Sequence, residues 1–89
     1  MLYASTKGAI ETLTKGLALE LASRKIRVNA IAAGTFKGAA GTVLAEKTPL
    51  GRLGRITDIA PLAVFLASDE SGWITGEVIR VAGGLVVAT

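Results

Sequence analysis

Apolar residues recur at spacings of three and four in the first part of the chain. Such spacing places them on one face of a helix that runs from Leu2 to about Arg24. At ~1.5 Å per residue, this helix would be roughly 33 Å long. The apolar positions are Ile10, Leu13, Leu17 and Leu21. The pattern therefore predicts one long amphipathic helix at the start of the chain.

The helical spacing stops after this segment. Residues 26–33 are too few for a second helix and are rich in small and β-branched residues, which is typical of a parallel strand buried on both faces. From Gly34 to about Thr57 the chain carries five glycines and little periodicity. An irregular stretch of this length is usually either functional, such as an active-site lid, or disordered, and both interpretations stay open.

A second helix and a second strand are predicted in the last third of the chain. Thr57 or Asp58 can cap the helix, with Pro61 in its first turn, and apolar residues continue to Leu66. Polar residues 68–72 predict a turn, and residues 77–81 predict a strand. Residues 1–89 therefore form a single α/β domain, in which a long helix is followed by a β-α-β unit with two parallel strands.

Composition narrows the chemistry that this domain can perform. The 89 residues contain neither cysteine nor histidine, so disulfides, thiolate nucleophiles, Ser-His-Asp triads and the common transition-metal ligands are excluded. We expect no metal site. The apolar fraction of 51% includes no run near the ~20 residues that cross a bilayer. We therefore expect a cytoplasmic protein with no membrane partner.

The net charge of +3 is modest, and the basic residues are spread along the chain. Nucleic-acid-binding proteins usually concentrate basic and aromatic residues on one face. The one short basic run, residues 24–27, fits a helix end, where cations interact favourably with the dipole. We expect no nucleic-acid partner.

Tyr3 and Lys7 are the candidate chemical groups of the first helix. Residues four apart share a helix face, so the phenol and the ammonium would point into the same space. A nearby cation favours the phenolate, which makes a tyrosine a better acid and base. The alternative is an aromatic side chain packed at the surface beside a solvated lysine, because a pattern of two residues is short.

The order of several motifs resembles one protein family. These are Tyr3-Ala4-Ser5-Thr6-Lys7, residues 17–22 (LALELA), 26–31 (IRVNAI), 49–54 (PLGRLG), 65–68 (FLAS) and 74–76 (ITG), and Gly83-Gly84. Together they are similar to the C-terminal half of a short-chain dehydrogenase/reductase, close in pattern to 3-oxoacyl-carrier-protein reductases. The resemblance implies a partial Rossmann-like fold and hydride transfer between a carbonyl or alcohol and NAD or NADP.

The resemblance also implies a role for individual residues. Tyr3 would be the general acid/base, and Lys7 would assist it and hold the nicotinamide ribose. Gly34 and Thr35 would lie beside the nicotinamide carboxamide. Three positions depart from the family pattern: Ala33 and Ile56 replace prolines, and Ala82 replaces an aspartate.

The family's glycine-rich pyrophosphate turn precedes the tyrosine, and these 89 residues do not contain it. Two hypotheses follow. The chain is the C-terminal half of an oxidoreductase, lacks the N-terminal dinucleotide-binding half, and is active only when a separate N-terminal half completes it. Alternatively, it is a non-enzymatic, self-associating remnant or interaction module. In both cases we expect a homo-oligomer that does not bind NAD or NADP by itself.

Overall fold

The computed structural model describes the backbone of residues 2–34 and 46–85, and the side chains of residues 7–34 and 46–85. Helix α1 spans Leu2–Leu21, strand β1 Ala30–Ala33, helix α3 Ile56–Ala67 and strand β2 Val78–Val81. The two strands pair in parallel, with Ala30 opposite Val78 and Ala33 opposite Val81. The predicted α/β fold, a long helix followed by a β-α-β unit, is confirmed.

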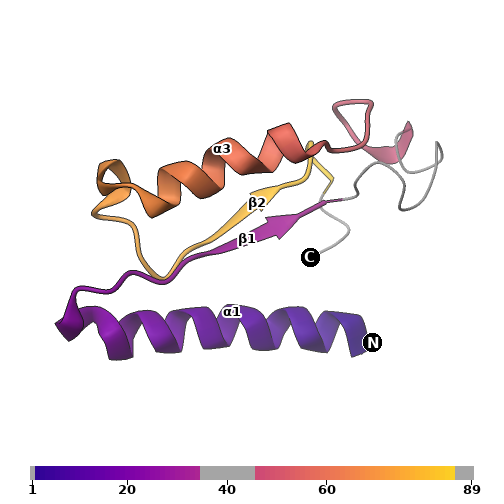
Figure 1. Ribbon diagram of the computed structural model, residues 1–89. Helices are drawn as coiled ribbons and strands as arrows, with labels where there is room; N and C mark the ends of the chain where they lie inside the picture. The colour runs from indigo at the N-terminus through magenta and orange to yellow at the C-terminus, as the bar shows by residue number, and fades with distance from the viewer. Residues whose placement is uncertain (1, 35–45, 86–89) are drawn as a thin grey trace.

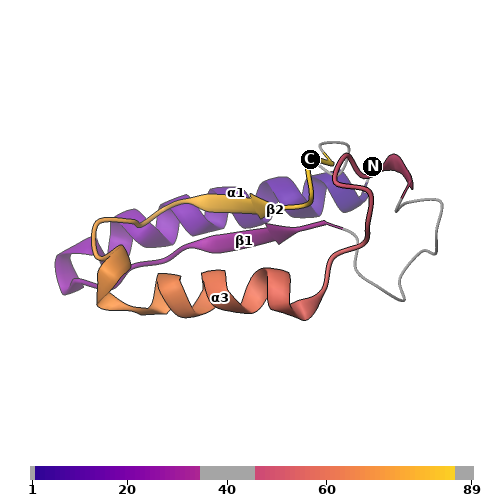
Figure 2. The same ribbon diagram turned by 90° about the horizontal axis from the view of Figure 1, so that it is seen from above.

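The two helices lie on opposite faces of the two-stranded sheet, so the molecule has three layers (Figure 1). The view from above shows that α1 lies behind β2, whereas α3 runs beside β1 (Figure 2). Both views place the N-terminal end of α1 at the same end of the molecule as the carboxyl ends of the strands. The helix therefore runs antiparallel to the sheet.

Both strands are shorter than the sequence predicted. The segment before Ala30 is bonded to the segment before Val78 partly through side chains: the Val28 N–H donates to Thr75 Oγ1 at 3.1 Å, and the Glu77 N–H donates to Asn29 Oδ1 at 3.1 Å. These side-chain bonds replace part of the regular backbone ladder between the two segments.

Helix α1 ends at Leu21 rather than near Arg24, and one 3₁₀ turn, Ala22–Arg24, follows it. Lys25 then adopts the left-handed conformation (φ 59°), and its N–H donates to the Ala22 carbonyl at 2.9 Å. Glycine usually occupies this position because it has no Cβ. This turn reverses the chain and starts the run toward β1.

The start of α3 differs from the prediction. Arg55, not Thr57 or Asp58, is the N-cap residue, and Asp58 is the third helical residue. Pro61 is consequently in the second turn, where it removes the helical hydrogen bond to the Thr57 carbonyl. The helix begins earlier than expected because the Asp58 carboxylate accepts the Arg55 N–H at 2.8 Å.

A buried polar network ties the end of α3 to the segment before β1. Ser71 is 1% exposed, and its Oγ accepts a hydrogen bond of 3.0 Å from Arg27. The same guanidinium donates to the carbonyl of Ser68 at 3.0 Å. Because the Ser68 carbonyl follows the last turn of α3, the Arg27 cation also compensates the negative end of the helix dipole.

The core is thin, as the length of the chain predicts. Among the described side chains, the buried apolar ones are Ala18 and Leu85, whereas Leu19 is 82%, Val64 70% and Trp73 99% exposed. In the described part of the chain, no helix is long and apolar enough to cross a membrane. Both helices thus expose large apolar side chains to solvent.

Candidate functional site

The carboxyl ends of the two strands define one edge of the sheet. Gly34 follows β1 directly, and Ala82 and Gly83 follow β2. The Gly34 N–H donates to the Val81 carbonyl at 2.9 Å, so the two strand ends stay paired up to this edge. In open α/β sheets, ligands bind in the crevice outside the carboxyl ends of the strands.

A cavity of about 150 Å³ lies at this edge. The strand ends form one side of it, and the segment that leads into α3, together with the first turns of α3, forms the other. Its lining residues are Gly34, Thr48, Leu50, Arg52, Gly54, Asp58, Ile59, Val81, Ala82 and Gly83. Sites for cofactors and drug-sized ligands usually measure roughly 300–1,000 Å³. The cavity therefore fits one ring-sized group, not a whole dinucleotide.

Gly34 stands where the structure leaves no room for a side chain. A Cβ at this position would lie 2.8 Å from both the Cα and the Cβ of Ala82. The backbones after the two strands consequently approach each other closely at the edge of the cavity. Glycine is required here for packing, independently of any ligand.

The turn of residues 48–51 docks on the segment after β2. The Leu50 N–H donates to the Gly83 carbonyl at 3.0 Å, and the Gly51 N–H closes the turn on the Thr48 carbonyl at 2.7 Å. Gly83 has φ 61°, and a Cβ there would lie 2.8 Å from Thr48 Cγ2. A glycine at this position thus allows both the left-handed turn and the close approach.

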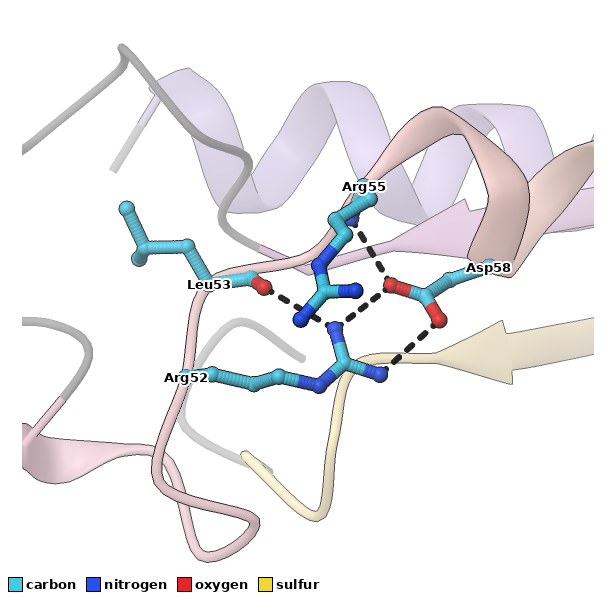
Figure 3. Close-up of polar contacts among 4 residues, drawn as sticks. All are labelled: Arg52, Leu53, Arg55 and Asp58. Carbon is cyan, nitrogen blue, oxygen red and sulfur yellow. Dashed lines mark hydrogen bonds and ion pairs between the residues drawn. The ribbon is translucent and has the colours of Figure 1, made fainter.

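Arg52 and Asp58 form a bidentate ion pair beside the cavity (Figure 3). The two guanidinium nitrogens donate to the two carboxylate oxygens at 2.7 and 2.9 Å, and one of them also donates to the Leu53 carbonyl at 3.1 Å. The hydrogen bonds from Arg52, and then the one from the Arg55 N–H, hold the pKa of Asp58 well below its ordinary value. The same carboxylate raises the pKa of Arg52.

Sequence reasoning did not find this ion pair. It treated Asp58 as a possible cap and Arg52 as one letter of a family motif. A recognisable signal was present, because a basic residue six positions before an acidic residue in a first helical turn can fold back onto it. Carboxylates are also favoured in that turn.

The predicted site residues are only partly described by the structure. Tyr3 and Lys7 both lie in α1, one turn apart, and Lys7 is half-buried. The phenol of Tyr3 and all of Thr35 lie outside the described side chains and residues. The fold brings the N-terminal end of α1 and the strand end at Gly34 to the same end of the molecule (Figures 1 and 2). The roles predicted for Tyr3, Lys7, Gly34 and Thr35 stay predictions.

Comparison with known proteins identifies the family. The family model described as "Enoyl-(Acyl carrier protein) reductase" matches residues 1–86. The 3-oxoacyl-[acyl-carrier-protein] reductase of Thermotoga maritima is 44% identical over 93 residues, which cover 96% of this chain and 38% of that protein.

Solved structures with the same fold include dinucleotide complexes. A 3-oxoacyl-[acyl-carrier protein] reductase from Brucella melitensis with bound NAD is 44% identical, with a TM-score of 0.84 over 93% of this chain and 32% of that one. A short-chain dehydrogenase from Leptospira borgpetersenii with bound NAD+ is 36% identical, with a TM-score of 0.87 over 96% of this chain and 35% of that one.

The chain thus belongs to the short-chain dehydrogenase/reductase family, as its motifs suggested. Its α/β architecture matches part of the Rossmann-like fold of these oxidoreductases. It spans about a third of the length of the relatives described above.

Proposed function

We propose that the chain is the C-terminal half of an NAD(P)-dependent carbonyl reductase or alcohol dehydrogenase. It catalyses the reaction only when an N-terminal half completes the enzyme. The observation that carries this proposal is that the N-terminal end of α1 and the carboxyl ends of both strands lie at the same end of the molecule. Tyr3 and Lys7 belong to that end of α1, and Gly34 ends β1.

The resemblance to the family implies a role for each residue of the proposed site. The nicotinamide, when bound, supplies or accepts the two electrons. The Tyr3 hydroxyl gives its proton to the substrate oxygen during reduction and takes it back during oxidation. The Lys7 ammonium would favour the phenolate and hold the ribose hydroxyls. Gly34 and Thr35 would lie against the carboxamide of the bound nicotinamide.

Two observations support the need for a second half. The described cavity of about 150 Å³ is too small for a dinucleotide. In addition, β1 pairs only with β2 in the described structure, so its other edge presents backbone N–H and C=O groups to a further strand. A partner half that adds a parallel strand at this edge of β1 would enlarge the sheet and supply the glycine-rich turn that binds the pyrophosphate.

Reconstitution tests this function. The chain is mixed with the part of the Thermotoga maritima relative that it does not match, and oxidation of NADH and of NADPH is followed with a 3-oxoacyl thioester. We expect carbonyl-dependent oxidation only when both parts are present. Complex formation without turnover for either cofactor would contradict the proposal.

Two variants assign the chemistry within the reconstituted enzyme. Tyr3→Phe removes only the transferable proton, so we expect turnover to fall by a factor of roughly 10² or more while assembly persists. Lys7→Met should lower turnover and move the pH profile to higher pH. Lys15→Met, an exposed lysine two turns further along α1, is the matched control and should change neither. Equal turnover with Phe at position 3 would exclude a catalytic role for the phenol.

The second candidate function is that of a non-enzymatic module that associates with itself. It is favoured by the exposure of large apolar side chains on both helices and in the turn before β2, among them Leu19, Val64 and Trp73. Exposed apolar groups of this size often mark an interface. Self-association without any reconstituted activity would favour this function over the first.

A further inference from the structure

The segment of residues 48–54 lies at the carboxyl edge of the sheet and is held at two points. At one point, the Leu50 N–H donates to the Gly83 carbonyl at 3.0 Å. At the other, Arg52 holds the Asp58 carboxylate through two hydrogen bonds of 2.7 and 2.9 Å. We call residues 48–54 the strap.

The strap forms one wall of the cavity whose opposite wall contains Gly34. Thr48, Leu50, Arg52 and Gly54 line the cavity from the strap. The position of the strap therefore sets the width of the cavity. A change at either attachment would alter the space that any bound group finds beside the strand ends.

The attachment at Asp58 also fixes the start of α3. The carboxylate accepts two bonds from the Arg52 side chain and one of 2.8 Å from the Arg55 N–H, while the Asp58 N–H donates to the Arg55 carbonyl at 2.9 Å. One carboxylate thus joins the strap, the N-cap and the first helical turn. A planar guanidinium suits this role because its forked donors match a carboxylate in one orientation.

We propose that Arg52 and Asp58 are a positioning pair, which fixes the strap on the first turn of α3 and so sets the shape of the cavity beside Gly34. The pair acts through Leu50, because Arg52 follows the docked turn by one residue. Its value for catalysis rests on the proposed oxidoreductase function, whereas its effect on the strap does not.

Amide hydrogen exchange on the chain itself tests the positioning role. In Arg52→Met, we expect the Leu50 amide to exchange roughly two- to fivefold faster than in the unmodified chain, as befits a partly exposed ion pair. The Ala30 amide, which donates to the Glu77 carbonyl at the opposite end of the strands, should keep its rate. Asp58→Asn, which retains an oxygen for the Arg55 N–H, should give the same local acceleration.

Arg55→Met is the matched control. It removes the same charge from the same neighbourhood but keeps the backbone bond to Asp58, and in the described structure the Arg55 guanidinium makes no hydrogen bond to that carboxylate (Figure 3). We expect its Leu50 amide to exchange at the unmodified rate. An unchanged Leu50 rate in Arg52→Met, equal acceleration in Arg55→Met, or equal acceleration at Ala30 would each overturn the proposal.

Kinetics of the reconstituted enzyme give a second readout. Arg52→Met should raise KM for the carbonyl substrate with a smaller effect on kcat, because the wall of the site is misplaced while the acid/base pair is intact. A fall in kcat with unchanged KM would contradict the assignment. If reconstitution gives no turnover, the oxidoreductase proposal fails and the exchange result still decides the role of the pair.

Discussion

Replacing Gly34 with alanine adds one methyl group at the tightest point of the candidate site. The new Cβ would lie 2.8 Å from the Cα and the Cβ of Ala82, whereas carbon atoms prefer to be about 3.5–4.0 Å apart. The backbone would have to move by roughly 0.7–1.2 Å on that comparison. Overpacking of this kind costs about 1–3 kcal/mol. Because one of the clashing atoms is backbone, we expect about 2 kcal/mol.

Urea and thermal unfolding followed by circular dichroism measure this loss. For a domain of this size, each kcal/mol lowers the Tm by roughly 4–8 °C, so Gly34→Ala should melt about 10 °C lower. Gly8→Ala is the matched control, because a Cβ there meets nothing within 4 Å on an exposed face of α1. Alanine should instead stabilise that helix by about 0.5–1 kcal/mol.

A double variant separates the clash from other effects of the methyl group. Ala82→Gly removes one of the two nearest atoms and leaves the Cα in place, so Gly34→Ala combined with Ala82→Gly should recover part of the stability, judged by the coupling between the two changes. The reasoning is refuted if Gly34→Ala is as stable as the unmodified chain. It is also refuted if the two changes are additive.

Four further measurements follow from the structure. Ser71→Ala removes a fully buried acceptor from Arg27 and should lower the free energy of unfolding by about 2 kcal/mol, whereas the exposed Ser23→Ala should change it by less than about 0.5 kcal/mol in the same urea titration. The pKa of Asp58 is lowered in the folded chain, so its contribution to the free energy of unfolding is present above about pH 4 and is lost as the pH falls further. Between about pH 7 and pH 3, the free energy of unfolding of Asp58→Asn should therefore fall less than that of the unmodified chain. Fluorescence titration of the chain alone should show no NADH or NADPH binding with a dissociation constant below about 10 μM, since micromolar affinity needs a binding free energy of roughly −8 kcal/mol. Saturable binding with a dissociation constant below about 10 μM would contradict the need for a second half. Sedimentation should show a homo-oligomer, and a cooperatively folded monomer of 9.1 kDa would contradict it.

The fold was largely predictable from the sequence because periodicity reports burial. The leucine and isoleucine spacing of α1 and the short β-branched segments gave the order of the elements and the parallel pairing. The ends of the elements were less predictable, since individual side chains decide them. Asn29 and Thr75 replace part of the strand ladder through side-chain hydrogen bonds, and Lys25 adopts the left-handed conformation that glycine usually occupies. Propensities do not encode such local substitutions.

The candidate site divides in the same way. Tyr3 and Lys7 could be named as candidates from the sequence because they belong to a motif with fixed spacing. Gly34 could be named because it follows a predicted strand in a chain that resembles the family. The pairing of Arg52 with Asp58 had one sequence signal, a basic residue six positions before a carboxylate in a first helical turn. That signal does not fix the pairing, which depends on how the strap folds back over the strand ends. The contact of Gly34 with Ala82 joins residues 48 positions apart in the chain, and no local pattern indicates it.

The position of the Tyr3–Lys7 turn relative to Gly34 follows from the lengths of the two segments once the structure supplies the chain reversal at Lys25. From Lys25 back to Lys7 the helical chain covers 18 residues, or about 27 Å at ~1.5 Å per residue. From Lys25 forward to Gly34 the extended chain covers nine residues, or about 30 Å at ~3.3 Å per residue. Since Lys25 reverses the chain, the two paths run side by side and end nearly level. Inserting one helical turn between Gly16 and Leu21 would displace Tyr3 by roughly 5 Å along α1, and we expect it to abolish reconstituted turnover even though every site residue remains.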